Sequence, residues 1–536
     1  MGVRDGGLTR RGWVAGTAAW TALAGGAAPD PARAQGGAPK RGGTLTLPLT
    51  PEPPVLVPGV DNQGPTLIAG SKIYQGLLKY SPKLEPLPEL AKGWEISEDR
   101  RVYTFRLQEG VRFHDGMPMT SEDVVFSVTR FHAELSPHAR GVFAAIERAE
   151  APDPLTVRLV LKAPFEPFLL LFDATSCAIV PKHVFDGADP RTDPRTQTPI
   201  GTGPFRFVEW RRGEFIRLRR FEAYWKPGQP YLDEIVFRVI PDGRSRALAV
   251  QTGQVQLAAA NDLDPSDVAG LQAQPNLEAR AAGWELFAPL MWVELNHRSG
   301  PLGDARVRRA IAHALDRDVV QRRVWSGAGK PAGGPIASAT RSHDPRSSLP
   351  GYDPRAAAEL LDAAGLAPDA RGVRFVLRHL VVPHGEVWAR LADYLRASLR
   401  AVGVEVVLEG TDAAGWAGRV ADWDYDTTAN VLYQYGDPAL GVERSYVSSN
   451  IRKVLFANTG GYANPRVDEA FARARLDADP AARRQAVAEA QRLLVEDMPQ
   501  IWLLEMAFPT VSDKRLRNHL QTGTGVHASF DDVFFV

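Results

Sequence analysis

Cysteine is almost absent from this chain, which has 536 residues and a single thiol, Cys177. One thiol can form neither an internal disulfide nor a thiolate metal cluster. The sequence therefore argues against a disulfide framework and against redox chemistry based on paired thiols.

An excess of charge of one sign is also absent, because 63 Lys and Arg residues balance 63 Asp and Glu residues. Without a basic patch or a long run of like charge, the sequence predicts no nucleic-acid partner. The mature chain also lacks an uncharged apolar run of about 18 residues, which a transmembrane helix requires. With 44% hydrophobic residues, the sequence predicts a soluble protein of two or three lobes with large cores.

The first residues carry the pattern of an export signal. Arg10 and Arg11 precede a weakly apolar run, 13–24, and small residues at Ala32 and Ala34 follow. This order resembles a twin-arginine signal, and we expect cleavage after Ala34. The alternative is a disordered basic N-terminus. No cysteine lies near the cleavage site, so we predict a periplasmic protein without a lipid anchor.

The first half of the mature chain is rich in strand patterns. Helix signals interrupt it once, where Thr120 begins a capping pattern and an apolar segment continues to about Phe131. The predicted strands cover residues 41–47, 102–107, 156–161, 205–210, 215–219 and 235–240.

The second half alternates strands and helices. Residues 373–377 and 404–408 read as strands, and 386–400 reads as an amphipathic helix between them. This βαβ pattern predicts a parallel sheet, whose ligands usually bind beyond the carboxyl ends of the strands. The loop 378–385 leaves one such end, so Arg378 and His384 are candidate ligand contacts.

Enzyme signatures are missing. The sequence has no Gly-x-Ser-x-Gly elbow and no His-Glu-x-x-His motif, and residues 201–205 lack the lysine of a phosphate-binding loop. His132 and His138 lie near each other but have no third ligand in sequence. We therefore predict no catalytic residue, no cofactor and no metal.

Several collinear segments together resemble the family 5 solute-binding proteins of peptide, opine and nickel ABC importers, over about 490 residues. They are Leu90–Ser97, Tyr103–Leu107, Gly110–Gly116, Thr120–Ser127, Pro181–His183, Pro199–Phe205, Tyr231–Ile235, Asp304–Ile311, Tyr352–Pro354 and Asp437–Pro438.

The resemblance implies an α/β, bilobed periplasmic-binding-protein fold of type II-like topology, with three discontinuous domains and a hinge. Domain I would combine 35–75, 196–282 and 505–536, domain II would be 76–195, and domain III would be 283–504. Such a protein, expected to be a monomer, closes on its solute and docks on a membrane permease powered by an ATPase.

The resemblance also implies a ligand, namely a short peptide or peptide-like solute. An opine, a glycoside or a metal chelate is the alternative within the class. A periplasmic chaperone-like protein that binds unfolded chains is the alternative outside it.

The segment before Pro438 is the sharpest candidate site. In peptide-binding relatives the matching stretch often carries a tryptophan followed by an aspartate, which lies four residues before the proline. This aspartate pairs with the α-ammonium of the peptide. Here Val431 and Gln434 occupy those places. A glutamine cannot neutralise an ammonium, and Asp437 is either an alternative anchor or a turn residue.

Aromatic residues are concentrated around this segment. Rigid rings provide contact area in a cleft at small entropic cost, although core packing explains some of them. The candidates for a ligand-binding wall are Trp416, Tyr433 and Tyr435.

Overall fold

The structure, a computed structural model, describes residues 39–136, 139–259, 262–477 and 479–536. The predicted signal segment 1–34 and His138 lie outside the described residues.

The first sheet joins the beginning of the described chain to a much later segment. Its order is β1 (Thr44–Pro48), β10 (Glu234–Arg238), β9 (Phe215–Arg220) and β8 (Phe205–Arg211). β1 runs parallel to β10, and the other pairs are antiparallel. Alternate residues such as Leu45, Ile235 and Leu218 are fully buried, as the period of two requires. They share one core with α1 (Gly64–Ile73) and with Val533 near the C-terminus.

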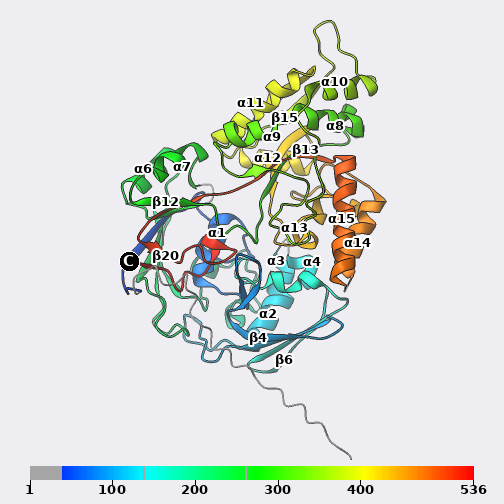
Figure 1. Ribbon diagram of the computed structural model, residues 1–536. Helices are drawn as coiled ribbons and strands as arrows, with labels where there is room; N and C mark the ends of the chain where they lie inside the picture. Colours follow the sequence, from blue (N-terminus) through cyan, green and yellow to red (C-terminus); the bar gives the residue numbers. More distant parts are fainter. Residues whose placement is uncertain (1–38, 137–138, 260–261, 478) are drawn as a thin grey trace, which may run out of the picture. The chain divides into compact units, whose positions relative to one another are not determined.

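A smaller three-stranded sheet extends this region. It contains β11 (Leu257–Ala258), β19 (Thr510–Asp513) and β12 (Leu277–Arg280), and the helices α6 (Gly243–Gln251) and α7 (Pro265–Gln272) pack beside it. Figure 1 shows both helices next to β12. A strand near the C-terminus therefore completes a sheet formed by residues about 240 positions earlier in the sequence.

The third sheet is wholly antiparallel. Its order is β4 (Ala91–Ile96), β5 (Val102–Leu107), β7 (Thr156–Leu161) and β6 (Ile146–Asp153). The strands predicted at 102–107 and 156–161 are confirmed at these bounds. Tyr103, Phe105 and Leu107 enter one core, which also contains the buried Cys177.

The helix predicted after Thr120 is present but not uniform. α2 (Ser121–Phe126) begins with a capping box, continues as a wider π-helical turn over Ser127–Phe131, and ends as α3 (His132–Leu135). The hydroxyl of Ser127 donates to the carbonyl of Asp123 at 2.7 Å. Because such a hydroxyl competes with the backbone for the same carbonyl, it favours a widened turn.

The second half forms a six-stranded mixed sheet. Its order is β14 (Lys330–Pro331), β18 (Gln500–Glu505), β13 (Leu290–Leu295), β17 (Thr427–Leu432), β15 (Phe375–Leu380) and β16 (Val404–Glu409). β15 and β16 are parallel and α11 (Glu386–Arg400) connects them, so the predicted βαβ unit is confirmed. The fold is mixed α/β.

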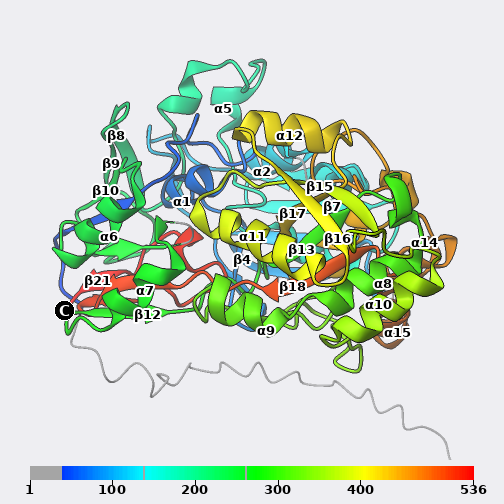
Figure 2. The same ribbon diagram turned by 90° about the horizontal axis from the view of Figure 1, so that it is seen from above.

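Helices cover this sheet. They include α8 (Ala305–Ala314), α10 (Pro354–Ala363), α12 (Ala413–Ala421), α14 (Pro465–Leu476) and α15 (Pro480–Asp497). Figure 1 shows α14 and α15 side by side, and Figure 2 shows α11 along the strands β15 and β16. The apolar face of α11 turns inward, where Leu391, Leu395 and Leu399 are buried and Val387 is partly buried against the same core.

Two short segments connect the sheets of the two halves. Residues 281–289 lead from β12 to β13, and residues 506–509 lead from β18 to β19. The domain boundaries given above stay a prediction.

Candidate ligand-binding site

The segment Tyr433–Asp437 follows β17 directly and precedes the short helix α13 (Pro438–Gly441). β17 runs parallel to β15 beside it. The segment therefore lies at the carboxyl end of a parallel strand pair, where ligands bind in open α/β sheets.

A turn at Gly436 brings this segment against the core of the third sheet. Gly436 has a φ of +70°, and a Cβ there would lie 2.9 Å from a methyl group of Leu84 and 3.5 Å from one of Leu170. Its carbonyl accepts a hydrogen bond of 3.0 Å from the backbone N–H of Arg341. The candidate site thus lies where the core of the six-stranded sheet meets the core of the antiparallel sheet.

Gln434 is held by structural contacts. Its side chain is 3% exposed, and its Oε1 accepts from the Ala337 N–H at 2.9 Å and from the Thr340 hydroxyl at 2.7 Å. Its Nε2 donates to the Pro335 carbonyl at 3.0 Å. Because the oxygen already accepts two hydrogen bonds, it has little capacity left for a ligand's ammonium. Gln434 fixes the 335–340 segment, and its contact with a ligand stays a prediction.

Asp437 is fully buried and caps α13. Its Oδ1 accepts from the Ala439 N–H at 2.9 Å and from Nη2 of Arg483 at 2.6 Å. Burial raises the pKa of Asp437, and the Arg483 guanidinium opposes that shift. Arg483 therefore already pairs with Asp437 within the protein, whereas the buried Oδ2 of Asp437 has no hydrogen-bond partner among the described residues. The role of Asp437 as an anchor or as a turn residue stays a prediction.

Aromatic rings surround Tyr433 and Tyr435. The ring of Phe287 lies 5.2 Å from Tyr433 and 6.3 Å from Tyr435, measured between centroids. Trp284 lies 6.2 Å from Tyr433, and the ring of His527 lies 4.8 Å from Phe287. These residues form a packed aromatic cluster, called the aromatic wall below, from three distant parts of the chain: the 281–289 connection, the β17 end and the C-terminal region.

Lys72 holds the turn that carries His527. Its ammonium is fully buried and donates to the carbonyls of Val526 at 2.7 Å and Ala528 at 2.6 Å. It also lies 4.1 Å from the ring centroid of Phe530, where a cation–π contact stabilises it. Burial first, and then the charge of Lys72, lowers the pKa of His527 to about 3, so this imidazole is neutral at physiological pH.

The other predicted residues lie elsewhere on the sheet. Trp416 is 5% exposed, and its indole N–H donates to the Thr428 hydroxyl at 3.0 Å. Its ring lies 6.3 Å from that of His384. Burial accounts for Trp416 as a core residue, and no contact with a ligand is needed to explain it.

Arg378 differs from the prediction. It was expected in a loop, but β15 continues to Leu380 because its pairing with β16 continues to Glu409. Its Nη1 lies 2.9 Å from Asp424, and its Nη2 lies 3.5 Å from Asp426. Two carboxylates therefore already satisfy this guanidinium.

Sequence reasoning missed Trp284, Phe287 and His527. The two aromatics directly follow the predicted boundary at 282/283, which was the one available signal. Nothing in the sequence connects them to His527, 240 positions after Phe287, because only the tertiary fold brings these rings together.

In the described part of the chain, no group of three or more His, Cys, Asp or Glu side chains is placed to hold a metal ion. His132 is fully buried, with its Nε2 2.8 Å from the Ala178 carbonyl oxygen. A membrane-spanning helix is likewise not found among the helices of the described residues, none of which has the necessary length and apolar character.

Sequence comparison finds relatives over most of the chain. The glutathione-binding protein GsiB of Pectobacterium atrosepticum is 28% identical over 477 residues, covering 86% of this chain and 87% of the relative. Protein XP55 of Streptomyces lividans is 31% identical over 467 residues, covering 85% and 82%.

Solved structures share the fold. The periplasmic binding protein DppA of Helicobacter pylori, in complex with the peptide STSA, has a TM-score of 0.79 at 24% identity and covers 92% of this chain and 98% of its own. The oligopeptide-binding protein AppA of Bacillus subtilis, in complex with a nonapeptide, has a TM-score of 0.80 at 22% identity and covers 93% and 100%.

Residues 85–496 match the family described as bacterial extracellular solute-binding proteins, family 5 Middle. The matched residues are more than half of the chain and include β17 and the whole Tyr433–Asp437 segment. This chain belongs to the family 5 bacterial extracellular solute-binding proteins.

Proposed function

We propose that the chain is the periplasmic substrate-binding component of an ABC importer, which captures a short peptide or peptide-like solute and delivers it to a membrane permease driven by an ATPase. The observation that carries this proposal is the position of Tyr433–Asp437, at the carboxyl end of β17 and against a second core at Gly436. A solute held there would contact both halves of the chain.

The relatives support a peptide-like solute. One is named for glutathione, and two solved structures of the same fold contain peptides. The relatives are binding proteins, and accordingly we propose solute capture without a catalytic step.

We further propose that the chain forms three discontinuous domains with the boundaries predicted above. The two connections 281–289 and 506–509 would form the hinge, and the protein would be a monomer. Hinge closure would bring Arg341 and Gly436 on one side against Leu84 on the other, which is the contact described here. Export through the N-terminal signal, without a lipid anchor, belongs to the same proposal.

The test is to identify the solute and to measure closure. Native mass spectrometry of the freshly purified mature protein should reveal a retained solute, or one acquired from a pool of di- to tetrapeptides. Small-angle scattering should then show a smaller radius of gyration with ligand, because ligand binds the closed form preferentially.

A matched pair of variants places the binding site. Tyr433→Ala should weaken binding by about tenfold or more, because it removes a ring from the aromatic wall. Tyr352→Ala is the control and should leave affinity unchanged, because Tyr352 is 55% exposed. Absence of any bound solute, or equal effects of the two variants, would contradict the proposed function or the proposed place of the site, respectively.

A further inference from the structure

The outer face of the first sheet is formed by side chains of three neighbouring strands. The strand β9 lies between β10 and β8, and both pairings are antiparallel. Residues directly opposite each other in such pairs point to the same side of the sheet. Ile216 and Leu218 of β9, which pair with Phe237 and Ile235 of β10, are completely buried. The alternate residues of these strands therefore form the outer face.

Five arginines lie on this outer face, which we call the arginine face. They are Arg206 and Arg211 of β8, Arg217 and Arg219 of β9, and Arg238 of β10. The side chains of Arg211, Arg217 and Arg219 are 59%, 38% and 52% exposed, so the arginine face is open to solvent.

The arginine face carries more cations than anions. Among the residues of β8, β9 and β10, the carboxylates on this face are those of Glu209 and Glu234. Glu209 lies 2.6 Å from Arg211 and 3.8 Å from Arg217, and Glu234 lies 3.4 Å from Arg219. Five guanidinium groups and two carboxylates leave a net charge of +3, whereas the whole chain has a formal charge of zero.

Two of the five arginines lack a counter-charge altogether. Within the described residues, neither Arg206 nor Arg238 has a carboxylate within 4.0 Å. Both therefore remain available for an anion outside the protein.

An aromatic ring lies among the guanidinium groups. Phe215 is opposite both Arg211 and Arg238, and the guanidinium carbons of Arg217 and Arg211 lie 5.1 Å and 5.4 Å from its ring centroid. Such cation–π contacts orient the guanidinium groups. Val236, opposite Arg217, is half-buried, so the centre of the arginine face is partly apolar.

The spacing of the arginines excludes a single small anion as the partner of the whole face. Neighbouring strands are about 5 Å apart, and alternate residues along a strand are about 7 Å apart. Arg206 and Arg238 lie two strands apart and at opposite ends of the face, so their Cα atoms are separated by more than about 10 Å. An anion that contacts both must itself be an extended surface.

The sequence alone predicts no basic patch, and the arginine face corrects that prediction. Along β9 the arginines alternate with buried apolar residues, so they form no run. Arg206 and Arg211 are five positions apart and share a face only because a β-bulge between Phe207 and Glu209 shifts the register. The patch therefore arises only when the three strands pair.

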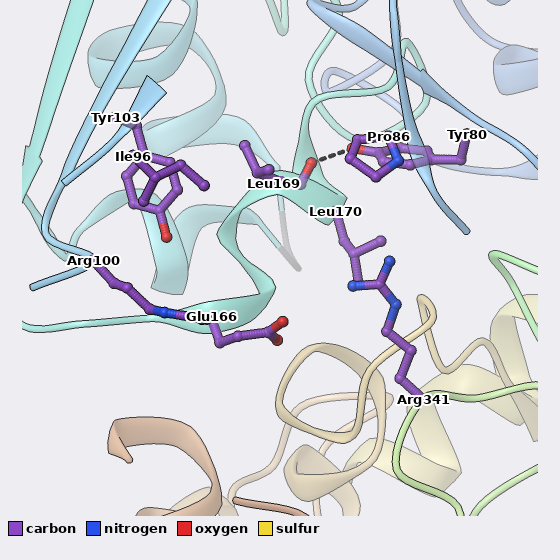
Figure 3. Close-up of a pocket in the computed structure, with 9 residues that line it drawn as sticks. All are labelled: Tyr80, Pro86, Ile96, Arg100, Tyr103, Glu166, Leu169, Leu170 and Arg341. Atoms are coloured by element: carbon purple, nitrogen blue, oxygen red, sulfur yellow. Dashed lines mark hydrogen bonds between the residues drawn. The ribbon is translucent and has the colours of Figure 1, made fainter. Parts of the chain in front are cut away.

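The position of the arginine face differs from that of the other arginines without a carboxylate. Figure 2 shows β8 and β9 at the left of the view, away from the six-stranded sheet. Figure 3 shows Arg100 and Arg341 on either side of Glu166, around a cavity of about 100 Å³. Arginines around a cavity do not present one flat surface, whereas those of the arginine face do.

We propose that the arginine face binds the surface of a membrane that contains anionic phospholipids. Guanidinium groups match the geometry of phosphate, and the headgroup region also accommodates an aromatic ring such as that of Phe215. This inference goes beyond the proposed function and rests on it for one point, namely that the destination of the protein is a permease in a membrane. Reversible attachment to lipid keeps the protein near that permease.

The test measures binding of the purified mature protein to lipid vesicles that contain no protein. At about 50 mM NaCl, vesicles of phosphatidylglycerol and phosphatidylcholine in equal parts should bind it at least about tenfold more tightly than vesicles of phosphatidylcholine alone. Sedimentation with the vesicles measures this ratio. At about 500 mM NaCl the binding should be lost, because salt screens exposed charges.

Two double variants with the same change of charge locate the surface. Arg206→Gln combined with Arg238→Gln should weaken binding to the mixed vesicles by about tenfold or more, because each arginine near an anionic membrane contributes to attachment. Arg322→Gln combined with Arg323→Gln, at two exposed positions of the turn Val320–Val324, should change binding by less than about twofold. Circular dichroism establishes that both variants are folded.

A single variant should act in the opposite direction. Glu209→Gln removes the carboxylate that Arg211 and Arg217 share, so it should strengthen binding to the mixed vesicles by about fivefold. Glycerol phosphate at constant ionic strength tests the alternative of a site for one phosphate group. It should not displace the protein, because the arginines are too widely spaced for one small anion.

The outcomes separate this proposal from the proposed function. Equal binding to the two kinds of vesicle, equal losses in the two double variants, or displacement by glycerol phosphate overturns the membrane role of the arginine face. Absence of binding to the mixed vesicles overturns it as well, and leaves an acidic protein surface as the alternative partner. The vesicles contain neither solute nor permease, so solute retention and contraction decide the proposed function separately.

Discussion

Arg483 donates a hydrogen bond of 2.6 Å to the carboxylate of Asp437, and both side chains are almost completely buried. The same guanidinium lies 3.5 Å from Glu166, in the short helix Glu166–Leu171 of the antiparallel-sheet region. One residue of α15 therefore joins the end of β17 to a second core, and its charge is essential to both contacts.

We expect Arg483→Met to destabilise the protein by about 3–5 kcal/mol, because it leaves Asp437 buried without a counter-charge. Urea unfolding followed by circular dichroism measures the effect. Arg492→Met is the control, since its ion pair with Glu496 on the same helix is half exposed and should contribute about 0–1 kcal/mol. Equal losses in the two variants would contradict the assigned role of the buried pair.

Glu443 should make stability depend on pH. Burial raises its pKa to about 7, although Arg475 lies 2.9 Å away and opposes the shift. The folded protein then holds a proton that the unfolded chain releases near pH 4.5, the ordinary value of the group. Its contribution to stability is present below that pH and is lost as the pH rises through about 7.

Glu443→Gln should therefore remove this loss. Relative to the parent, the variant should gain up to about 3 kcal/mol of unfolding free energy between pH 4 and pH 8. Urea titrations at both pH values measure the difference, with Glu496→Gln as an exposed control. A gain that is the same at both pH values would refute the assignment.

Gly436→Ala should destabilise the protein for two reasons: the added methyl group lacks space, and the backbone conformation at this position disfavours alanine. Its Cβ would lie 2.9 Å from Leu84, and its φ is +70°. Gly213 has a φ of +76° with no atom within 4 Å of its Cβ position, so Gly213→Ala measures the conformational cost alone, about 1 kcal/mol. Thermal unfolding of both variants should show a larger loss for Gly436→Ala.

Export should depend on the paired arginines. Replacement of Arg10 and Arg11 by lysine should leave uncleaved precursor in the cytoplasm, because the twin-arginine pathway reads that pair. Cell fractionation with antibody detection measures this. Arg4→Lys, outside the pair, is the control, and unchanged periplasmic yield in the double variant would rule out this pathway.

The local parts of the fold could be predicted from the sequence. The βαβ unit is recognisable because the apolar periodicity of its strands and of its helix is visible within short stretches of sequence. The helix α11 begins and ends at the same residues as its amphipathic pattern. The π-helical turn at Ser127–Phe131 was missed because the α-helical and π-helical periods are indistinguishable over five residues.

The candidate site was predictable only in part. The sequence singles out the Tyr433–Asp437 segment as a candidate, but it does not show the partners that determine the chemistry of that segment. Arg483 lies 46 residues from Asp437, and Ala337 lies 97 residues from Gln434. A sequence pattern shows that a carboxylate is available, whereas only the fold shows that an arginine already neutralises it.

The single thiol, Cys177, can be used to measure slow opening of the core that contains it. It is fully buried, its N–H donates to the Asp173 carbonyl at 2.8 Å, and burial raises its pKa. A thiol reagent in solution can reach it only while that core is open. The rate at which Cys177 of the natural protein is labelled therefore measures how often this core opens. The decrease of that rate on addition of solute measures how much the solute stabilises the closed core.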